Sequence, residues 1–451
     1  MRILARLAAI LAAFTLAVQP VAAQSILRDA EGEKLLQDMM DPLAVAAGLQ
    51  PGAVEVVLIS DPSLNAFVAG GQRVFVHSGL INAAGSAEEV QGVLAHELGH
   101  ITGGHIVRRG EGMRAATNIS ILSALLGVAA ALAGAGDAAM GVLMAGQQAA
   151  MGKFLAYSRT EEASADAASV EYLTKAGISG QGAVNFFKRL QNLEFRHGYS
   201  QSEEAGFYRT HPLTGDRIAR LEADFKAGPY WNKPPDPEIQ QRFERMRAKL
   251  YGYLAEPRDT LNVYPPSMQT IPAHYARAYA YHKDAQVQRA LDETDALIRK
   301  EPDNPYFLEL RGQVLLESGR PTEAVAPLRQ AMRLSGGAPM IAASLGHALI
   351  ATEDSSNFEE AERVLRASVA RDRRNPFAWY QLGVVYAARG DVPRARLASA
   401  EQQVMSGRYQ EALHSAKAAE YALPHGSPDW IRAQDVAIEA QDALEQLDNR
   451  R

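Results

Sequence analysis

Apolar residues recur at the spacing of a helix face in the segment that begins near Ser86. The repeating positions are Val90, Val93, Leu94 and Ile101. This spacing favours an amphipathic helix. Ser86 and Glu89 form a capping box, in which each side chain can satisfy an otherwise unpaired backbone donor. The first firm breaker is the Gly103-Gly104 pair, so we predict a helix from about residue 86 to 102.

Small residues recur with a period of 34 in the C-terminal part of the chain. They are Ala278, Gly312, Gly346 and Gly383 in successive first helices, and Ala290, Ala324, Ala361 and Ala395 in the second helices. One interval is 37 because residues 353–357 lengthen a turn. The period is that of tetratricopeptide repeats, in which paired helices approach closely at small residues. We therefore predict an all-α repeat solenoid over residues 273–451 with a groove for protein segments.

The first 23 residues have the order of charge and hydrophobicity that is typical of a secretory signal. A basic head precedes an apolar run from Leu7 to Val18, and small residues precede a cut after Ala23. The run is too short to span a bilayer core of roughly 30 Å. The chain has no cysteine, which excludes an N-terminal lipid anchor and disulfides. We expect the mature chain in a bacterial periplasm.

Length and charge set the outer limits of the interpretation. A chain of 451 residues suggests two or three domains. We expect a signal peptide (1–23), a peptidase domain (24–228), a Pro-rich linker with one helix (229–272) and the repeats (273–451). The formal net charge of -6 provides no basic footprint, so nucleic acid is not an expected partner.

Candidate chemistry lies in the first predicted helix, which contains His96-Glu97-Leu98-Gly99-His100. Residues four apart share a helix face, so His96 and His100 can bind one metal ion while Glu97 stands beside it. The alternative is a core helix with hydrogen-bonded histidines. Catalytic zinc usually has three protein ligands, so a third ligand is needed. On a continuous helix His105 lies off this face, and we expect it to be a surface histidine.

The third ligand is expected in Ser158-Arg159-Thr160-Glu161-Glu162-Ala163-Ser164-Ala165-Asp166. Ser158 and Glu161 form a second capping box, which predicts a helix that begins at Ser158 and stops near Gly177. Glu162 and Asp166 share a face, so Glu162 can bind the metal while Asp166 accepts the free N–H of a ligating histidine. An acidic, solvated first turn remains the alternative on spacing alone.

An uncharged insertion lies between the two predicted helices. Asp137 is its one ionisable residue over 115–152. The first half is formally long enough to cross a bilayer, but polar residues interrupt both halves. Two structures remain open: a transmembrane pair, or a helical hairpin that covers the site or dips its apolar face into a membrane surface.

The order of these motifs resembles the gluzincin peptidase family that includes HtpX and the CAAX prenyl proteases. The matching stretches are His96–His100, Glu162–Asp166, Asn65-Ala66-Phe67-Val68-Ala69-Gly70-Gly71, and Thr210-His211-Pro212-Leu213 with Arg217. The resemblance implies a mainly α fold with a small β-sheet in the protease domain, an α+β metallopeptidase, followed by the all-α solenoid. It implies one Zn²⁺ per chain held by His96, His100 and Glu162.

The resemblance also implies roles for residues that spacing alone does not assign. Glu97 is the expected catalytic base, and Asp166 is expected to accept the free N–H of a ligating histidine. His211 is expected to steady the transition-state oxyanion or to occupy the open zinc position at rest. Asn65, Ala66, Phe67 and Arg217 are the substrate-binding candidates. The strand before the motif helix, residues 73–77, is expected to pair with substrate as an edge strand.

A signal peptide, a metallopeptidase domain and repeats in one chain resemble periplasmic protease-chaperones of outer-membrane assembly. This implies cleavage of misassembled or unfolded outer-membrane proteins, chaperone-like assistance, docking on the β-barrel assembly machinery and peripheral membrane contact. A chaperone or scaffold with a latent site is the second hypothesis. A protease inside the bilayer is the third, and it requires that residues 115–152 span.

Overall fold

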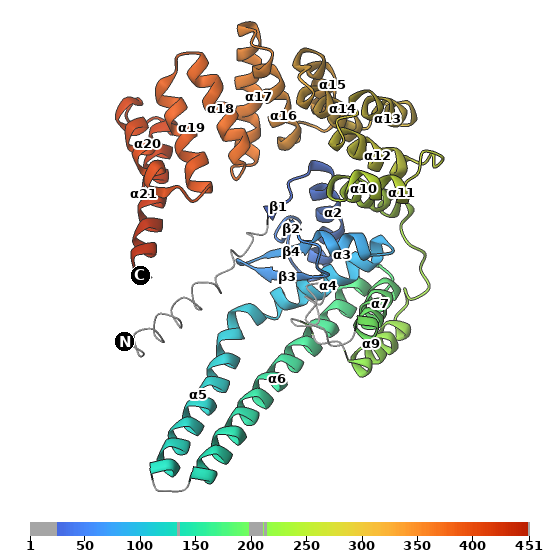
Figure 1. Cartoon of the computed structure of the whole chain (residues 1–451), viewed down its shortest axis with the longest axis vertical. Helices are drawn as coiled ribbons and strands as arrows, with labels where there is room; N and C mark the ends of the chain where they lie inside the picture. The colour runs from blue at the N-terminus through green and yellow to red at the C-terminus, as the bar shows by residue number, and fades with distance from the viewer. Residues whose placement is uncertain (1–24, 133–135, 198–210, 212–213, 450–451) are drawn as a thin grey trace, which may run out of the picture. The chain divides into compact units, whose positions relative to one another are not determined.

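The computed structural model describes residues 25–132, 136–197, 211 and 214–449 (Figure 1). The expected signal peptide lies outside these residues, as do Thr210, Pro212 and Leu213 of the expected site segment. Contacts divide the chain into two compact units. The first contains described residues 25–27, 43–84 and 92–231, and the second contains residues 28–42, 85–91 and 232–451.

A four-stranded sheet and helices make up the first unit. The strands are β1 (Ser25–Ile26), β2 (Glu55–Ser60), β3 (Ala66–Ala69) and β4 (Arg73–His77), in the order β1-β2-β4-β3. The helices are α3 (Ser78–Ala83), the later turns of α4 (Ala87–Thr102), α5 (His105–Leu132), α6 (Gly136–Lys175), α7 (Gln181–His197) and α9 (Gly215–Ala227). Helix α2 (Ala30–Ala46) begins in the second unit and ends in the first.

The expected edge strand is wrong by one strand. β4 pairs with β2 in parallel on one side and with β3 antiparallel on the other, so it is internal. Gly70 and Gly71 have φ values of 60° and 95° and turn the chain between β3 and β4. This turn lets residues 66–69 (β3) pair with the edge of β4 that β2 does not occupy. In the described sheet, β3 is therefore the edge strand that follows the Asn65 segment.

The capping box at the start of α4 is confirmed. The Glu89 backbone N–H donates to Ser86 Oγ at 3.3 Å, and the Glu89 carboxylate accepts from the Gly85 backbone N–H at 2.7 Å. The Ala87 backbone N–H donates to Gln240 Oε1 at 2.9 Å. Side chains therefore satisfy three backbone donors at the start of the motif helix, those of Gly85, Ala87 and Glu89.

The predicted helix start at Ser158 is wrong. Helix α6 is continuous from Gly136 to Lys175, because the segment before Ser158 is rich in alanine and contains no proline to interrupt it. The predicted stop is confirmed, since Gly177 has a φ of 66° just after the last turn. Ser158 therefore lies inside a continuous helix, although its local sequence has the pattern of a helix start.

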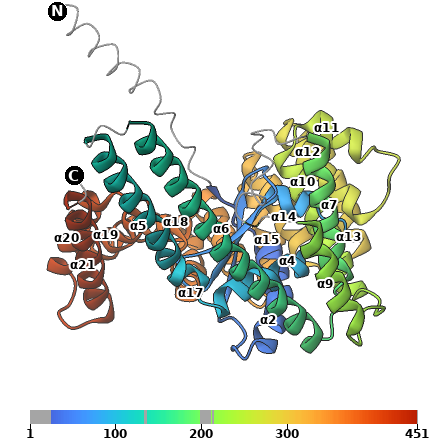
Figure 2. The same cartoon turned by 90° about the horizontal axis from the view of Figure 1, so that it is seen from below.

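Helices α5 and α6 pack side by side as a long hairpin, which both views show (Figures 1 and 2). Large apolar side chains are exposed along it: Ile121, Leu122, Leu125, Leu126, Met140, Met144 and Met151. Across the described residues, no helix combines the length and apolar character that a membrane span requires.

The second unit contains the helical repeats. Helices α10 (Pro237–Leu254) and α11 (Pro257–Val263) occupy the segment 229–272, for which one helix was expected. The paired helices that follow are α12 (Ile271–Lys283), α13 (Val287–Lys300), α14 (Pro305–Glu317), α15 (Pro321–Leu334), α16 (Pro339–Ala351), α17 (Phe358–Arg371), α18 (Pro376–Ala388), α19 (Val392–Met405), α20 (Tyr409–Ala422) and α21 (Pro428–Asp448). A short 3-10 helix, η2 (Ser355–Asn357), fills the lengthened turn.

The small residues of the repeats lie where close packing needs them. Ala290, Ala324 and Ala361 are fully buried. A Cβ atom at Gly312 would overlap Leu328, and one at Gly346 would overlap Leu365. Gly383 has more room, since the nearest atom to its Cβ would be 3.5 Å away. These residues are packing positions, as the period predicted.

Candidate metal centre

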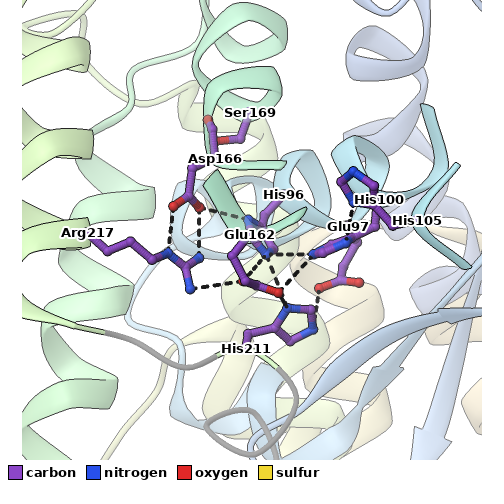
Figure 3. Close-up of polar contacts among 9 residues, drawn as sticks. All are labelled: His96, Glu97, His100, His105, Glu162, Asp166, Ser169, His211 and Arg217. Carbon is purple, nitrogen blue, oxygen red and sulfur yellow. Dashed lines mark hydrogen bonds and ion pairs between the residues drawn. The ribbon is translucent and has the colours of Figure 1, made fainter. Parts of the chain in front are cut away.

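Four buried side chains from separate parts of the chain converge in the first unit. His96 and His100 come from α4, Glu162 comes from α6, and His211 precedes α9 (Figure 3). One potential ligand atom from each residue lies within 4.8 Å of the others. Their exposed fractions are 0%, 8%, 4% and 6% respectively. The three ligands expected from the sequence are therefore together, and His211 joins them.

The distances within this group suit a tetrahedral metal site. His96 Nε2 lies 3.1 Å from His100 Nε2 and 3.4 Å from Glu162 Oε2. His211 Nδ1 lies 3.3 Å from His96 Nε2 and 2.9 Å from Glu162 Oε1. Zinc–ligand bonds of about 2.0–2.1 Å at tetrahedral angles place ligand atoms about 3.3–3.4 Å apart. The donor set and its spacing therefore fit zinc.

The electrostatics of the group favour positive charge near its centre. Burial alone would lower the pKa of His96, but hydrogen bonds and charge from Asp166 and Glu162 outweigh it and raise that pKa to about 10. Burial, together with positive charge on His96 and His211, lowers the pKa of His100 to about 2. The positive charge that the carboxylates favour is here a proton on His96. A ligating imidazole must be neutral, so a metal cation bound in this group would take the place of that proton.

Asp166 and Arg217 support the ligands from outside the group. His96 Nδ1 lies 3.0 Å from Asp166 Oδ1, so the carboxylate can accept the hydrogen of this histidine, as the spacing predicted. Arg217 Nε donates to Asp166 Oδ2 at 2.6 Å, and Arg217 Nη1 lies 2.9 Å from Glu162 Oε2. Burial raises the pKa of Asp166, but bonds from His96 and Arg217 lower it overall. The structure thus places Arg217 against the two carboxylates.

Glu97 lies on α4 beside these four potential metal ligands, which we call the donor group. It is 1% exposed, and its Oε1 lies 3.5 Å from His211 Nε2. Burial raises the pKa of this carboxyl, and the charges of His211 and His96 oppose the shift. A buried carboxylate with a raised pKa next to a metal site suits proton transfer.

The other candidates lie on the edge strand and the turn before it. Phe67 stacks on Phe75 with ring centroids 5.1 Å apart, and the Asn65 carbonyl accepts from the His77 backbone N–H at 3.0 Å. Ala66 is fully buried. Their contribution to substrate binding stays a prediction.

The expected surface position of His105 is wrong. His105 is 4% exposed, and its Nδ1 lies 2.9 Å from His100 Nδ1. Helix α4 ends at Thr102, and Gly104 has a φ of 64°, so the chain turns before α5 begins at His105. The prediction continued one helix through Gly103 and Gly104 to place His105, and the helix does not continue there. The glycine pair was the signal in the sequence that the helix ends before His105.

A buried cluster of three histidines and a glutamate, with an adjacent carboxylate and a separate array of helix pairs, defines a metallopeptidase that carries repeats. Residues 30–224 match the sequence model of peptidase family M48, and residues 275–339 and 351–405 match that of the tetratricopeptide repeat. Residues 30–224 therefore form a peptidase family M48 domain, which tetratricopeptide repeats follow. The family and fold class expected from the motifs are confirmed.

Curated relatives cover different shares of the chain. A protein of Vibrio cholerae serotype O1 is 30% identical over 260 residues, which cover 56% of this chain and 52%, about half, of the relative. The beta-barrel assembly-enhancing protease of Escherichia coli K12 is 25% identical over 402 residues, which cover 87% of this chain and 79% of the relative. Metalloprotease YcaL of the same strain is 33% identical and covers 40% of this chain and 64% of itself.

Among solved structures, the tetratricopeptide protein YrrB is 21% identical, with a TM-score of 0.31. The match covers 39% of this chain and 91% of YrrB.

Proposed function

We propose that this protein is a periplasmic zinc endopeptidase that acts on misassembled or stalled outer-membrane proteins. The observation that carries the chemistry is the buried donor group of His96, His100, Glu162 and His211 with Glu97 beside it. The relative from Escherichia coli and a second one from Yersinia pestis are both named beta-barrel assembly-enhancing protease, which supports the link to β-barrel assembly. The expected signal sequence supports the compartment.

In this proposal His96, His100 and Glu162 hold one zinc ion. When bound, zinc would acidify a water molecule and polarise the scissile carbonyl. Glu97 would accept the proton of that water and pass it to the leaving amine. Asp166 and Arg217 would hold His96 and Glu162 in place, because an ion pair fixes both carboxylates.

His211 would be a fourth ligand in a closed resting state. The support is its place within the donor group, 2.9 Å from Glu162 Oε1 and 3.3 Å from His96 Nε2. A group that steadied an oxyanion would instead need to point at the substrate carbonyl. A closed site also favours the second candidate function, a chaperone or scaffold that cleaves rarely.

The remaining parts would bring substrates to the site. The repeats would dock on the β-barrel assembly machinery and give chaperone-like assistance, since helical-repeat grooves bind protein segments. The exposed apolar residues of α5 and α6 would contact unfolded β-barrel proteins or a membrane surface. The edge strand β3, with Asn65, Ala66 and Phe67, would pair with the substrate backbone.

The test is the substitution Glu97→Gln, with Glu88→Gln on the same helix as the matched control. We expect Glu97→Gln to retain zinc and fold but to lose cleavage of casein and of itself, because the amide cannot accept the proton. Glu88→Gln should retain zinc, the fold and both cleavage activities. Persistent cleavage by purified Glu97→Gln would reject the proposed base. Full rescue of an outer-membrane assembly defect by the same variant would favour the chaperone function.

A further inference from the structure

His105 occupies a buried position against one of the proposed zinc ligands. Its ring and that of His100 meet at 77° with centroids 4.9 Å apart, and the two Nδ1 atoms are 2.9 Å apart (Figure 3). This distance is that of a hydrogen bond between nitrogens. One of the two Nδ1 atoms must therefore carry the hydrogen and the other must accept it.

The orientation of His100 towards the other potential metal ligands shows which Nδ1 atom carries the hydrogen. His100 turns its Nε2 towards the group, 3.1 Å from His96 Nε2 and 3.5 Å from Glu162 Oε1. A ligating imidazole uses the lone pair of that nitrogen, so its hydrogen must be on the other nitrogen. His100 Nδ1 is then the donor and His105 Nδ1 the acceptor. The hydrogen of His105 is on Nε2.

We propose that His105 is a positioning residue, which accepts the hydrogen bond of His100 Nδ1 and so fixes the tautomer and ring direction of this zinc ligand. The inference rests on the proposed zinc site. It completes a pattern, because Asp166 has the same relation to His96 at 3.0 Å. One ligating histidine is oriented by a carboxylate and the other by a neutral imidazole.

Gly103 provides the space for the His105 ring. A Cβ atom at this glycine would lie 2.8 Å from His105 Cε1 and closer still to Nε2. Such a contact would displace the ring, because the Gly99 carbonyl oxygen also lies 2.9 Å from the same Cβ and leaves the methyl group little room to move. Gly103→Ala therefore perturbs the position of His105 without changing its chemistry.

The experiment measures zinc affinity by chelator competition, and visible absorption of the Co²⁺-loaded protein, on the full chain. His105→Phe retains a ring without an acceptor. His105→Asn retains an acceptor oxygen one bond from Cγ, where Nδ1 lies. We expect the zinc Kd to rise about 10- to 100-fold in His105→Phe and in Gly103→Ala, and less than tenfold in His105→Asn. The Co²⁺ bands should shift in the first two variants.

His274→Phe is the matched control, because His274 is also 4% exposed and also hydrogen-bonded through Nδ1, to Glu293 in the repeat unit. Its zinc Kd should equal that of wild type. A wild-type zinc Kd and Co²⁺ spectrum in His105→Phe would overturn the inference about His105 but leave the proposed zinc site standing. Equal losses of zinc affinity in His105→Phe and His105→Asn would have the same consequence. A wild-type chain that binds neither metal would overturn the proposed function together with the inference.

Discussion

Gly99 lies between the two motif histidines, where α4 and α6 approach closely. Replacing it tests whether this approach creates the metal site. A Cβ atom at Gly99 would lie 2.8 Å from the Ala165 carbonyl oxygen, 2.9 Å from Ala165 Cα and 3.2 Å from Ala168 Cβ. Two of these atoms are backbone, which cannot rotate away. Gly99→Ala must therefore push α6 away from α4.

The size of this displacement follows from the distances. Ordinary contact begins at 3.4 Å, so the backbone near Ala165 must move by about 0.6 Å. Ala165 lies between Glu162 and Asp166, and both carboxylates move with it. Metal–ligand distances tolerate only about 0.2 Å. We therefore expect the zinc Kd of Gly99→Ala to rise tenfold or more, on the order seen when ligand orientation is lost.

The effect on folding should be small by comparison. Alanine favours a helix interior over glycine by about 1 kcal/mol, and overpacking costs about 1–3 kcal/mol. The free energy of unfolding of the metal-free chain should thus fall by at most about 2 kcal/mol. Gly141→Ala in α6 is the control, because the added Cβ would meet no neighbouring residue within 4 Å.

Zinc competition and denaturant unfolding of both variants separate the two effects. The expected result is a large loss of zinc affinity in Gly99→Ala, with unfolding close to wild type, and no loss of zinc in Gly141→Ala. Wild-type zinc affinity in Gly99→Ala would refute the reasoning that helix approach sets the ligand geometry.

Glu162→Ala should remove zinc while Glu161→Ala retains it, as elemental analysis would show; the reverse result would assign the ligand to Glu161. His211→Ala should accelerate peptide cleavage if His211 is a fourth ligand at rest, whereas slower cleavage would indicate oxyanion stabilisation. Burial raises the pKa of Glu309 to about 8 from 4.5, so its ionisation opposes folding: this penalty is absent below pH 4.5 and complete above pH 8. A pKa unit corresponds to about 1.4 kcal/mol, and the penalty is reduced here because Glu309 is only half-buried. Glu309→Gln should therefore raise the free energy of unfolding by about 1–2 kcal/mol at pH 8 and by almost nothing at pH 4. An equal gain at both pH values would contradict the raised pKa of Glu309.

Local patterns predicted the elements that carry the site. The capping box of Ser86 and Glu89 placed the start of α4, and the four-residue spacings put His96 with His100 and Glu162 with Asp166 on shared faces. These relations depend on helix geometry alone, which is the same wherever the helix lies. The 34-residue period predicted the helix pairs for the same reason, since each repeat contacts mainly its neighbours.

The errors occur where distant segments or single torsions decide. Ser158 has the pattern of a helix start, but the preceding residues continue α6 through it. The strand at residues 73–77 was expected at the edge, but the β3 hairpin covers it. His105 was extrapolated along a helix that ends at the glycine pair. In each case the outcome depends on packing or backbone torsions that spacing does not encode.

The sequence by itself determined the helix faces, the capping of α4, the repeat period and the types of ligand, because these follow from periodicity and side-chain chemistry. Only the tertiary structure decided that α4 and α6 meet at Gly99, that His211 enters the donor group and that His105 supports His100. The physical reason is that each of these contacts joins segments whose approach depends on close packing of whole elements, or on one left-handed torsion at Gly104.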